Sequence, residues 1–398
     1  MKNILRKKYL KLTEPFIDKQ IIKVLTGARR VGKTTILHQI SNLIKQKDKN
    51  ANIIFINKEY FEFRHIKNEK DLYLYVKEKT NKNTKNYVFI DEVQEILNFE
   101  IALNQLFAKQ YDIWCTGSNA KMLSGDLATY LSGRYIEFKI SSLSYNEFLE
   151  FHKLQNNNDT LLKYIRFGGM PYLINITLED ELVYGYLKSI YNTIILKDVI
   201  ARYNIRDIYF IERLTEYLSD NLGSYVSSKK ITDFLKSQHI SLSINTVLNY
   251  LQYLTNSFFI HKVQRYDIQG KKRFEINDKY YFEDLGLKHA VIPYQANDIG
   301  KVFENLVYKH LKNNGYTVYI GKLKNYEIDF VAQKNNITKY FQVAYLLPDE
   351  NVIEREFGNL LKINDNYEKT VISADELIKG DFHGIKHVNI KDFLTNIS

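Results

Sequence analysis

Nine residues near the start of the chain, Gly27 to Thr35, limit what it can fold into more than any other stretch. They read Gly-Ala-Arg-Arg-Val-Gly-Lys-Thr-Thr, which fits the pattern of a glycine, four residues and then Gly-Lys-Ser/Thr. The apolar run Ile21–Thr26 precedes them, and apolar residues at helical spacing follow from Thr34 to about Leu43. The sequence therefore predicts a buried strand, a glycine-rich turn and a helix, in that order.

This arrangement is typical of a phosphate site. The backbone N–H groups of such a loop and the positive end of the following helix attract an anion. We expect Lys33 to reach the terminal phosphates of a nucleotide and the Thr34 hydroxyl to bind Mg²⁺. The other loop residues are expected to surround the phosphates: Gly27, Ala28, Arg29, Arg30, Val31, Gly32 and Thr35. The predicted ligands are ATP and Mg²⁺.

A second signal lies about 60 residues further on, where four apolar residues are followed by Asp91 and Glu92. The apolar run predicts a buried parallel strand, and ligands of parallel sheets bind at the carboxyl ends of the strands. Asp91 is therefore expected to hold Mg²⁺ through water. Glu92 is expected to orient and polarise the attacking water as a general base.

The next predicted strand, residues 112–119, ends in small polar residues, and Ser118 or Asn119 would sense the γ-phosphate. Arg134 then stands just before a further strand at 135–140. The order of these motifs resembles that of AAA+-type ATPases. In that family an arginine at this place often reaches the nucleotide of a neighbouring subunit. The resemblance makes Arg134 a candidate finger, with a local salt bridge or helix cap as the alternative; Arg29 and Arg30 are rival arginines.

Composition bounds the rest of the interpretation. At 398 residues the chain has room for two or three domains. Its net charge of +10 permits a polyanionic partner, but lysine-rich composition also follows from AT-rich codons. The single cysteine, Cys115, fits a reducing compartment. Because the start is charged and no apolar run approaches about 18 residues, we expect a cytoplasmic protein without a membrane partner.

The middle of the chain predicts mostly helices. Residues 143–207 read as a helical lid, and the Gly-Gly-Met-Pro turn at 168–171 is either its hinge or a simple turn. Residues 208–290 resemble a winged helix, with two helices, a strand and a basic hairpin tip at 270–273. The second helix would offer three amide side chains to double-stranded DNA: Asn245, Asn249 and Gln252. Winged helices also contact proteins, so both kinds of partner stay open.

The last hundred residues resemble a nuclease domain. Restriction-endonuclease-like folds hold Mg²⁺ with a helix glutamate and a strand aspartate, and a lysine in a following Glu-x-Lys helps to activate water. Glu304 and Asp329 take the first two places, but Gln342 and Ala344 replace the Glu and Lys, and Glu327 is a substitute acid. We expect a degenerate domain kept for structure or binding. The alternative is an active nuclease with a displaced catalytic group.

The whole arrangement resembles a group of bacterial and archaeal ATPases that join an AAA+-like P-loop domain to a winged helix and a nuclease-like domain of unknown function. The implied fold class is α/β, with a P-loop domain at 1–142, a lid at 143–207, a winged helix at 208–290 and an endonuclease-like domain at 291–398. The implied activity is hydrolysis of ATP to ADP and phosphate, coupled to nucleic-acid binding. The alternative is a slow nucleotide-dependent switch that contacts other proteins or a second copy of the chain, without DNA binding or nuclease activity.

Overall fold

The computed structural model describes residues 4–120, 131–238, 242–273, 278–376 and 381–396. The chain divides into two compact units: Met1–Ser142 with Asn256–Phe258, and Leu143–Thr255 with Phe259–Ser398. Among the described residues, no helix is both long enough and apolar enough to cross a membrane.

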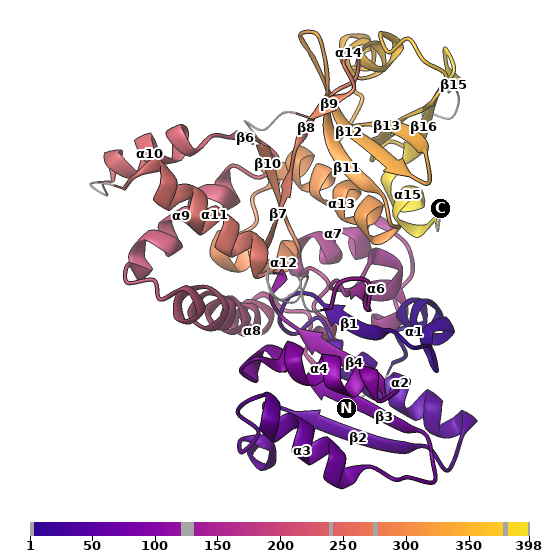
Figure 1. Ribbon diagram of the computed structural model, residues 1–398. Helices are drawn as coiled ribbons and strands as arrows, with labels where there is room; N and C mark the ends of the chain where they lie inside the picture. The colour runs from indigo at the N-terminus through magenta and orange to yellow at the C-terminus, as the bar shows by residue number, and fades with distance from the viewer. Residues whose placement is uncertain (1–3, 121–130, 239–241, 274–277, 377–380, 397–398) are drawn as a thin grey trace. The chain divides into compact units, whose positions relative to one another are not determined.

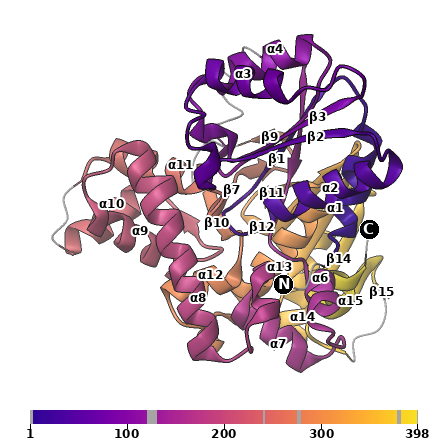
Figure 2. The same ribbon diagram turned by 90° about the horizontal axis from the view of Figure 1, so that it is seen from below.

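The first unit is built on a five-stranded sheet in the order β2-β3-β4-β1-β5, in which all neighbours run parallel. Figure 2 shows α3 and α4 on one face of this sheet and α2 on the other. The strands are β1 (Ile22–Thr26), β2 (Asn52–Asn57), β3 (Asn86–Asp91), β4 (Asp112–Gly117) and β5 (Tyr135–Lys139). The helices are α1 (Lys7–Thr13), α2 (Lys33–Lys47), α3 (Glu69–Lys79) and α4 (Phe99–Ala108).

Burial explains why these strands could be predicted. Every residue of β1 and β4 is buried, as expected for central strands covered on both faces. One core lies between the sheet and the helices α3 and α4, and its members include Val24, Ile90, Cys115, Leu72 and Leu103. Because all five strands are parallel, their carboxyl ends meet at one edge, and this edge carries the glycine-rich loop.

The second unit begins with helices: α6 (Tyr145–His152), α7 (Asn158–Phe167), α8 (Asp180–Thr193), a π-helix at Ile194–Ala201, α9 (Ile208–Asp220), α10 (Ser228–Ser237) and α11 (Ile244–Asn256). The turn between α7 and α8 is tightly packed, because a Cβ on Gly168 would lie 2.0 Å from Asp284 Oδ1 and one on Gly169 2.4 Å from Leu143 O. The Gly169 N–H also donates to Asp284 Oδ2 at 2.8 Å. These contacts favour a fixed turn over a hinge.

A small antiparallel sheet in the order β6-β10-β7 accompanies α9, α10 and α11 (Figure 1). Its strands are β6 (Tyr225–Val226), β7 (Ile260–Val263) and β10 (Asp278–Phe282). The basic tip expected at 270–273 does not extend this sheet. Instead, β8 (Arg265–Asp267) and β9 (Lys272–Arg273) form a hairpin in the other sheet of the unit, where β8 pairs with β11.

The larger sheet has eight strands in the order β15-β16-β14-β13-β12-β11-β8-β9. Its remaining strands are β11 (Thr317–Leu323), β12 (Tyr326–Lys334), β13 (Ile337–Val343), β14 (Glu368–Ser373), β15 (Asp381–Phe382) and β16 (Ile385–Asn389). The accompanying helices are α12 (Leu285–Val291), α13 (Ile299–Asn313), α14 (Glu350–Leu361) and α15 (Ile390–Thr395). In this sheet Glu327 and Asp329 lie on β12, and Gln342 lies on the neighbouring β13.

Candidate nucleotide site

The glycine-rich loop joins the end of β1 to the start of α2. Gly27 has φ +150° and a Cβ there would lie 2.1 Å from Ile140 O, so only glycine fits. Gly32, with φ +96°, directly precedes the first residue of α2. Ala28 and Val31 are buried within the loop, whereas Arg30 and Thr35 are exposed. The loop therefore presents its backbone and the N-terminus of α2 at the carboxyl edge of the sheet.

Lys33 is the first residue of α2, and it is only 4% exposed. Its Nζ donates to the backbone oxygens of Gly27 and Ala28, each at 2.9 Å, and lies 3.9 Å from Glu92 Oε1. An ammonium group held inside a phosphate loop is suited to neutralising phosphate oxygens. Arg29 contributes a second positive charge, and its Nη1 lies 3.6 Å from Glu59 Oε1.

Thr34, in the first turn of α2, is hydrogen-bonded to Asp91, the last residue of β3. The Thr34 hydroxyl donates to Asp91 Oδ2 at 2.8 Å, and the Thr116 hydroxyl donates to Asp91 Oδ1 at 2.6 Å. Burial raises the pKa of Asp91, and this effect outweighs the two hydrogen bonds, which lower it. A hydroxyl and a carboxylate are hard oxygen ligands, which Mg²⁺ prefers, so these residues fit the expected ion.

Glu92 directly follows β3 and adopts φ +55°, an uncommon conformation for this residue type. Its Oε2 accepts hydrogen bonds from Gln94 Nε2 and, at 3.1 Å, from the Ser118 hydroxyl. Its backbone N–H donates to Thr116 Oγ1 at 2.9 Å. Burial alone would raise the pKa of Glu92, but the charges of Lys33 and Arg29 outweigh it and hold the pKa below its usual value. The carboxylate is therefore fixed and ionised.

The expected sensors are not all at this site. Ser118 contacts Glu92, and Asn119 is buried at the end of the same segment. Arg134 instead precedes β5, and its backbone oxygen accepts from Ile22, the first residue of β1. Because β1 and β5 are parallel, this is the opposite edge of the sheet from the loop. There Arg134 donates to Asn104 Oδ1 and its guanidinium lies 5.7 Å from the Phe107 ring centre.

Three residues of this site escaped the sequence interpretation. Thr116 joins both acids, Gln94 binds Glu92, and the buried Arg6 donates to Val31 O and Ser141 O, each at 3.1 Å. Thr116 could have been inferred because it ends a strand next to the Asp-Glu strand. Arg6 and Gln94 belong to no local pattern that points to the loop.

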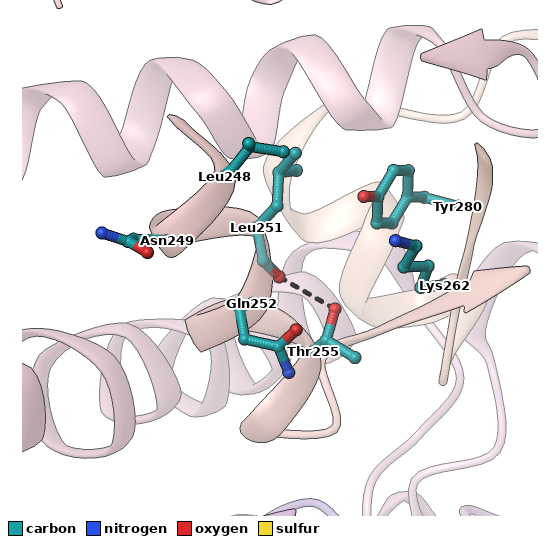
Figure 3. A pocket seen from close by; sticks show the side chains of 7 residues that line it. All are labelled: Leu248, Asn249, Leu251, Gln252, Thr255, Lys262 and Tyr280. Atoms are coloured by element: carbon teal, nitrogen blue, oxygen red, sulfur yellow. Dashed lines mark hydrogen bonds between the residues drawn. The ribbon is translucent and has the colours of Figure 1, made fainter. Parts of the chain in front are cut away.

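A separate pocket of about 280 Å³ lies beside α11 (Figure 3). One side consists of residues on α11: Leu248, Asn249, Leu251, Gln252 and Thr255. The other side consists of Lys262 on β7 and Tyr280 on β10, and Lys262 Nζ is paired with Asp278 Oδ2 at 2.9 Å. Two of the three amide residues expected to face DNA, Asn249 and Gln252, therefore line a hollow, and Asn245 is exposed on the same helix.

The acids expected at a nuclease centre also come together, with a partner that was not expected. Lys279 on β10 pairs with Glu304 on α13 and with Glu327 on β12. On the next strand, Gln342 Oε1 accepts from the Asp329 backbone N–H at 3.3 Å. Within the residues that the structure describes, no three His, Cys, Asp or Glu side chains are grouped so that they could hold a metal ion.

Family models of known proteins match two parts of the chain. The family model of an AAA domain matches residues 19–149, and a domain of unknown function matches residues 158–298. Among solved structures, the Walker-type ATPase PABY2304 of Pyrococcus abyssi is 17% identical, with a TM-score of 0.49 over 72% of this chain and 95% of that chain.

Two relatives align along most of the chain. An uncharacterized protein of Haemophilus influenzae is 35% identical over 399 residues, which cover 98% of each chain. The uncharacterized protein MJ1544 of Methanocaldococcus jannaschii is 33% identical over 352 residues, covering 84% of this chain and 77% of that protein. With the AAA domain in its first unit, the chain belongs with these two proteins to one family of AAA+-like P-loop ATPases.

Proposed function

We propose that the chain binds ATP with Mg²⁺ and hydrolyses it to ADP and phosphate. The observation that carries this proposal is the convergence of the loop and the two acids. Thr34 Oγ1 lies 2.8 Å from Asp91 Oδ2, and Lys33 Nζ lies 3.9 Å from Glu92 Oε1. Thr34 and Asp91 would hold Mg²⁺, whose charge would neutralise the phosphate oxygens.

Glu92 takes the role of general base. Its lowered pKa keeps the carboxylate ionised, and Gln94 and Ser118 hold its position, so that its oxygens are available to orient the attacking water and to take its proton. The water oxygen forms a bond to the γ-phosphorus in line with the bond to ADP, which breaks, and the proton passes to Glu92. Lys33 neutralises charge on the phosphates, and Ser118 or Asn119, directly after β4, senses the γ-phosphate.

Arg134 acts, in this proposal, on the nucleotide of a second copy of the chain. It lies at the sheet edge opposite its own loop, so it would reach a nucleotide only across an interface. Arg134→Ala should then bind ATP like the wild type but hydrolyse it at least tenfold more slowly. Hydrolysis at the wild-type rate would assign Arg134 to its local contacts with Asn104 and Phe107 instead.

Nucleic-acid binding is the proposed coupled activity. The exposed face of α11 carries Asn245, Asn249 and Gln252, and amide side chains of this kind recognise adenine in the major groove. Lys229 and Lys230 are exposed at the start of α10 and are suited to phosphate contacts. Helices α9 to α11 with the sheet β6-β10-β7 would act as the winged helix.

One observation favours the alternative of a protein-contacting switch. Ile244 and Leu248 are 46% and 48% exposed on the same helix, one turn apart. Apolar side chains of this size on a recognition surface are suited to a protein partner. The same face therefore offers both kinds of contact, and an experiment must separate them.

The test is steady-state ATP hydrolysis and binding of a labelled duplex at several salt concentrations. Lys33→Ala should abolish ATP binding, whereas Glu92→Gln should bind ATP and lose hydrolysis. The double variant Asn249→Ala/Gln252→Ala should weaken duplex binding about tenfold or more, because each good base contact contributes about 1–3 kcal/mol, while the matched variant Leu248→Ala leaves it unchanged.

The opposite results would be clear. A wild type that binds ATP but shows no salt-dependent affinity for DNA would favour the protein-contacting switch. A Glu92→Gln variant that hydrolyses ATP at the wild-type rate would remove Glu92 from the proposed reaction.

A further inference from the structure

The centre of the second unit holds a buried lysine among acids. Lys279 is on β10, and its side chain is only 5% exposed. Its Nζ lies 2.7 Å from Glu327 Oε1 and 3.3 Å from Glu304 Oε2. The Tyr281 hydroxyl donates to the same Glu304 oxygen at 2.9 Å. One ammonium group therefore joins three elements of the chain: β10, α13 and β12.

The other two residues of the expected metal site are bound to the backbone. Asp329 Oδ2 accepts from the Val343 N–H at 2.8 Å, and Gln342 Oε1 accepts from the Asp329 N–H at 3.3 Å. These contacts cross between the paired strands β12 and β13. They tie one side-chain oxygen of each residue to the sheet.

This donor set does not fit a divalent cation. Mg²⁺ needs oxygen ligands in near-octahedral geometry. Glu304 Oε2, one of the expected ligands, already accepts hydrogen bonds from the Lys279 ammonium and the Tyr281 hydroxyl. Gly223 borders that same oxygen, because a Cβ built there would lie 3.1 Å from it. Glu327 Oε1 is occupied in the same way, by Lys279 Nζ at 2.7 Å. Lys279 therefore occupies the carboxylate oxygens that the expected nuclease ion would need.

We propose that the Lys279 ammonium group takes the place of the nuclease metal ion. Its ion pairs with Glu304 and Glu327, here called the joint, connect the surrounding elements without a metal. The joint fixes the three-stranded sheet, through β10, to α13 and to the eight-stranded sheet. The stacked rings of Tyr281 and Tyr308, with centres 4.8 Å apart, reinforce the same connection. The helices beside the small sheet and the large sheet consequently move as one body.

The test is thermal unfolding of the full chain without nucleotide, with and without Mn²⁺. Manganese should shift the wild-type midpoint by less than about 1 °C. Lys279→Ala should lower the midpoint by about 6 °C or more, because removing one partner leaves buried charges unpaired. The vacated cluster should then bind Mn²⁺, which should raise the midpoint of Lys279→Ala by several degrees, and adding Glu304→Gln should remove this response. Lys279→Arg, which keeps the charge, should not respond to Mn²⁺.

Three results would overturn the proposal. The first is a wild-type response to Mn²⁺, or a Mn²⁺-dependent cleavage of DNA, that Glu304→Gln abolishes. The second is an unchanged midpoint for Lys279→Ala. The third is a destabilised Lys279→Ala that stays indifferent to Mn²⁺. If Lys279→Ala does not fold, Mn²⁺ binding followed by electron paramagnetic resonance decides the question: the wild type and Glu304→Gln should bind equal numbers of ions, and a site lost in Glu304→Gln would refute the proposal.

Discussion

A single hydroxyl supports both acids of the nucleotide site. Thr116 Oγ1 donates to Asp91 Oδ1 and accepts from the Glu92 N–H, and the side chain is fully buried. Few substitutions would remove two contacts at once without changing the shape of the site. Thr116→Val is one, because valine has nearly the same shape and lacks the hydroxyl.

We expect Thr116→Val to lower the free energy of unfolding by about 1–3 kcal/mol, the cost of leaving a buried polar group unpaired. It should also lower ATP hydrolysis about 10²-fold, because Glu92 would lose its fixed position. Thr116→Ser keeps the hydroxyl and should retain most of the activity. Steady-state hydrolysis and urea unfolding of the two variants check this, and equal activity in both would show that the hydroxyl has no such role.

A buried histidine makes stability depend on pH. Nδ1 of His289 lies 3.2 Å from the Arg166 backbone oxygen, so the neutral ring donates there, and burial lowers the pKa of His289 to about 3. The unfolded chain binds the proton below its ordinary pKa of about 6.5. The stability that the neutral His289 ring contributes is therefore complete above about pH 6.5, and it is lost as the pH falls toward 3.

The expected loss from His289 alone is about 2 kcal/mol between pH 7 and pH 5. His289→Asn keeps a donor for the Arg166 oxygen and does not titrate, so this variant should be less stable at pH 7 but lose about 2 kcal/mol less on acidification. Urea unfolding at both pH values measures the difference. Parallel losses in the two proteins would contradict the assignment.

Single residues were predictable where the motif is contiguous. Lys33, Thr34, Asp91 and Glu92 each belong to a short pattern that ends a strand or begins a helix, and the structure places them together. Lys279 was not predictable, because nothing near it in the sequence indicates that β10 lies beside the acids of α13 and β12. Tertiary contacts of this kind leave no local signal.

Helices and strands were predictable from the sequence when burial of one face or both faces gives them a regular pattern of apolar residues. The strands expected from residues 21, 52, 87, 112 and 135 onward are all present, within a residue or two at each end. The basic hairpin tip was expected in the winged helix, but its strands join the eight-stranded sheet, where the partner of β8 is β11, about 50 residues away. Pairing over that distance depends on how the sheets pack, which hydrophobic periodicity does not encode.

The loop between β1 and α2 should tolerate no side chain at Gly27. A Cβ there would meet Ile140 O at 2.1 Å, and the backbone oxygen cannot move without disturbing the chain at the end of β5. Gly27→Ala should therefore weaken ATP binding more than tenfold, measured by calorimetry. The matched control is Gly185→Ala in α8, where a Cβ meets nothing within 4 Å; it should be neutral or stabilise by about 0.4–1 kcal/mol. Equal ATP affinity in the two variants would contradict this reasoning.

At the scale of the whole molecule, each unit has its own hydrophobic core. A ligand of one unit should therefore stabilise that unit by mass action, about 2.7 kcal/mol at a hundredfold excess over Kd. Hydrogen exchange with ATP and Mg²⁺ should slow in β1 and β4 and stay unchanged in β12 and β13. Lys33→Ala should remove the effect, and equal slowing in both units would show that they open together.

The order of the first sheet also decides when the loop can form during synthesis. β1 pairs with β4, through Val24 and Cys115, and with β5, through Val24 and Glu137. At about 5–20 residues per second, the ribosome needs roughly 5–20 s after making β1 to produce even the first of these neighbours. The glycine-rich loop is thus translated well before the two strands that flank β1. A nascent chain that stops before Ile140 should be unable to hold ATP, and until β4 is made β1 is an unpaired strand that a chaperone can recognise.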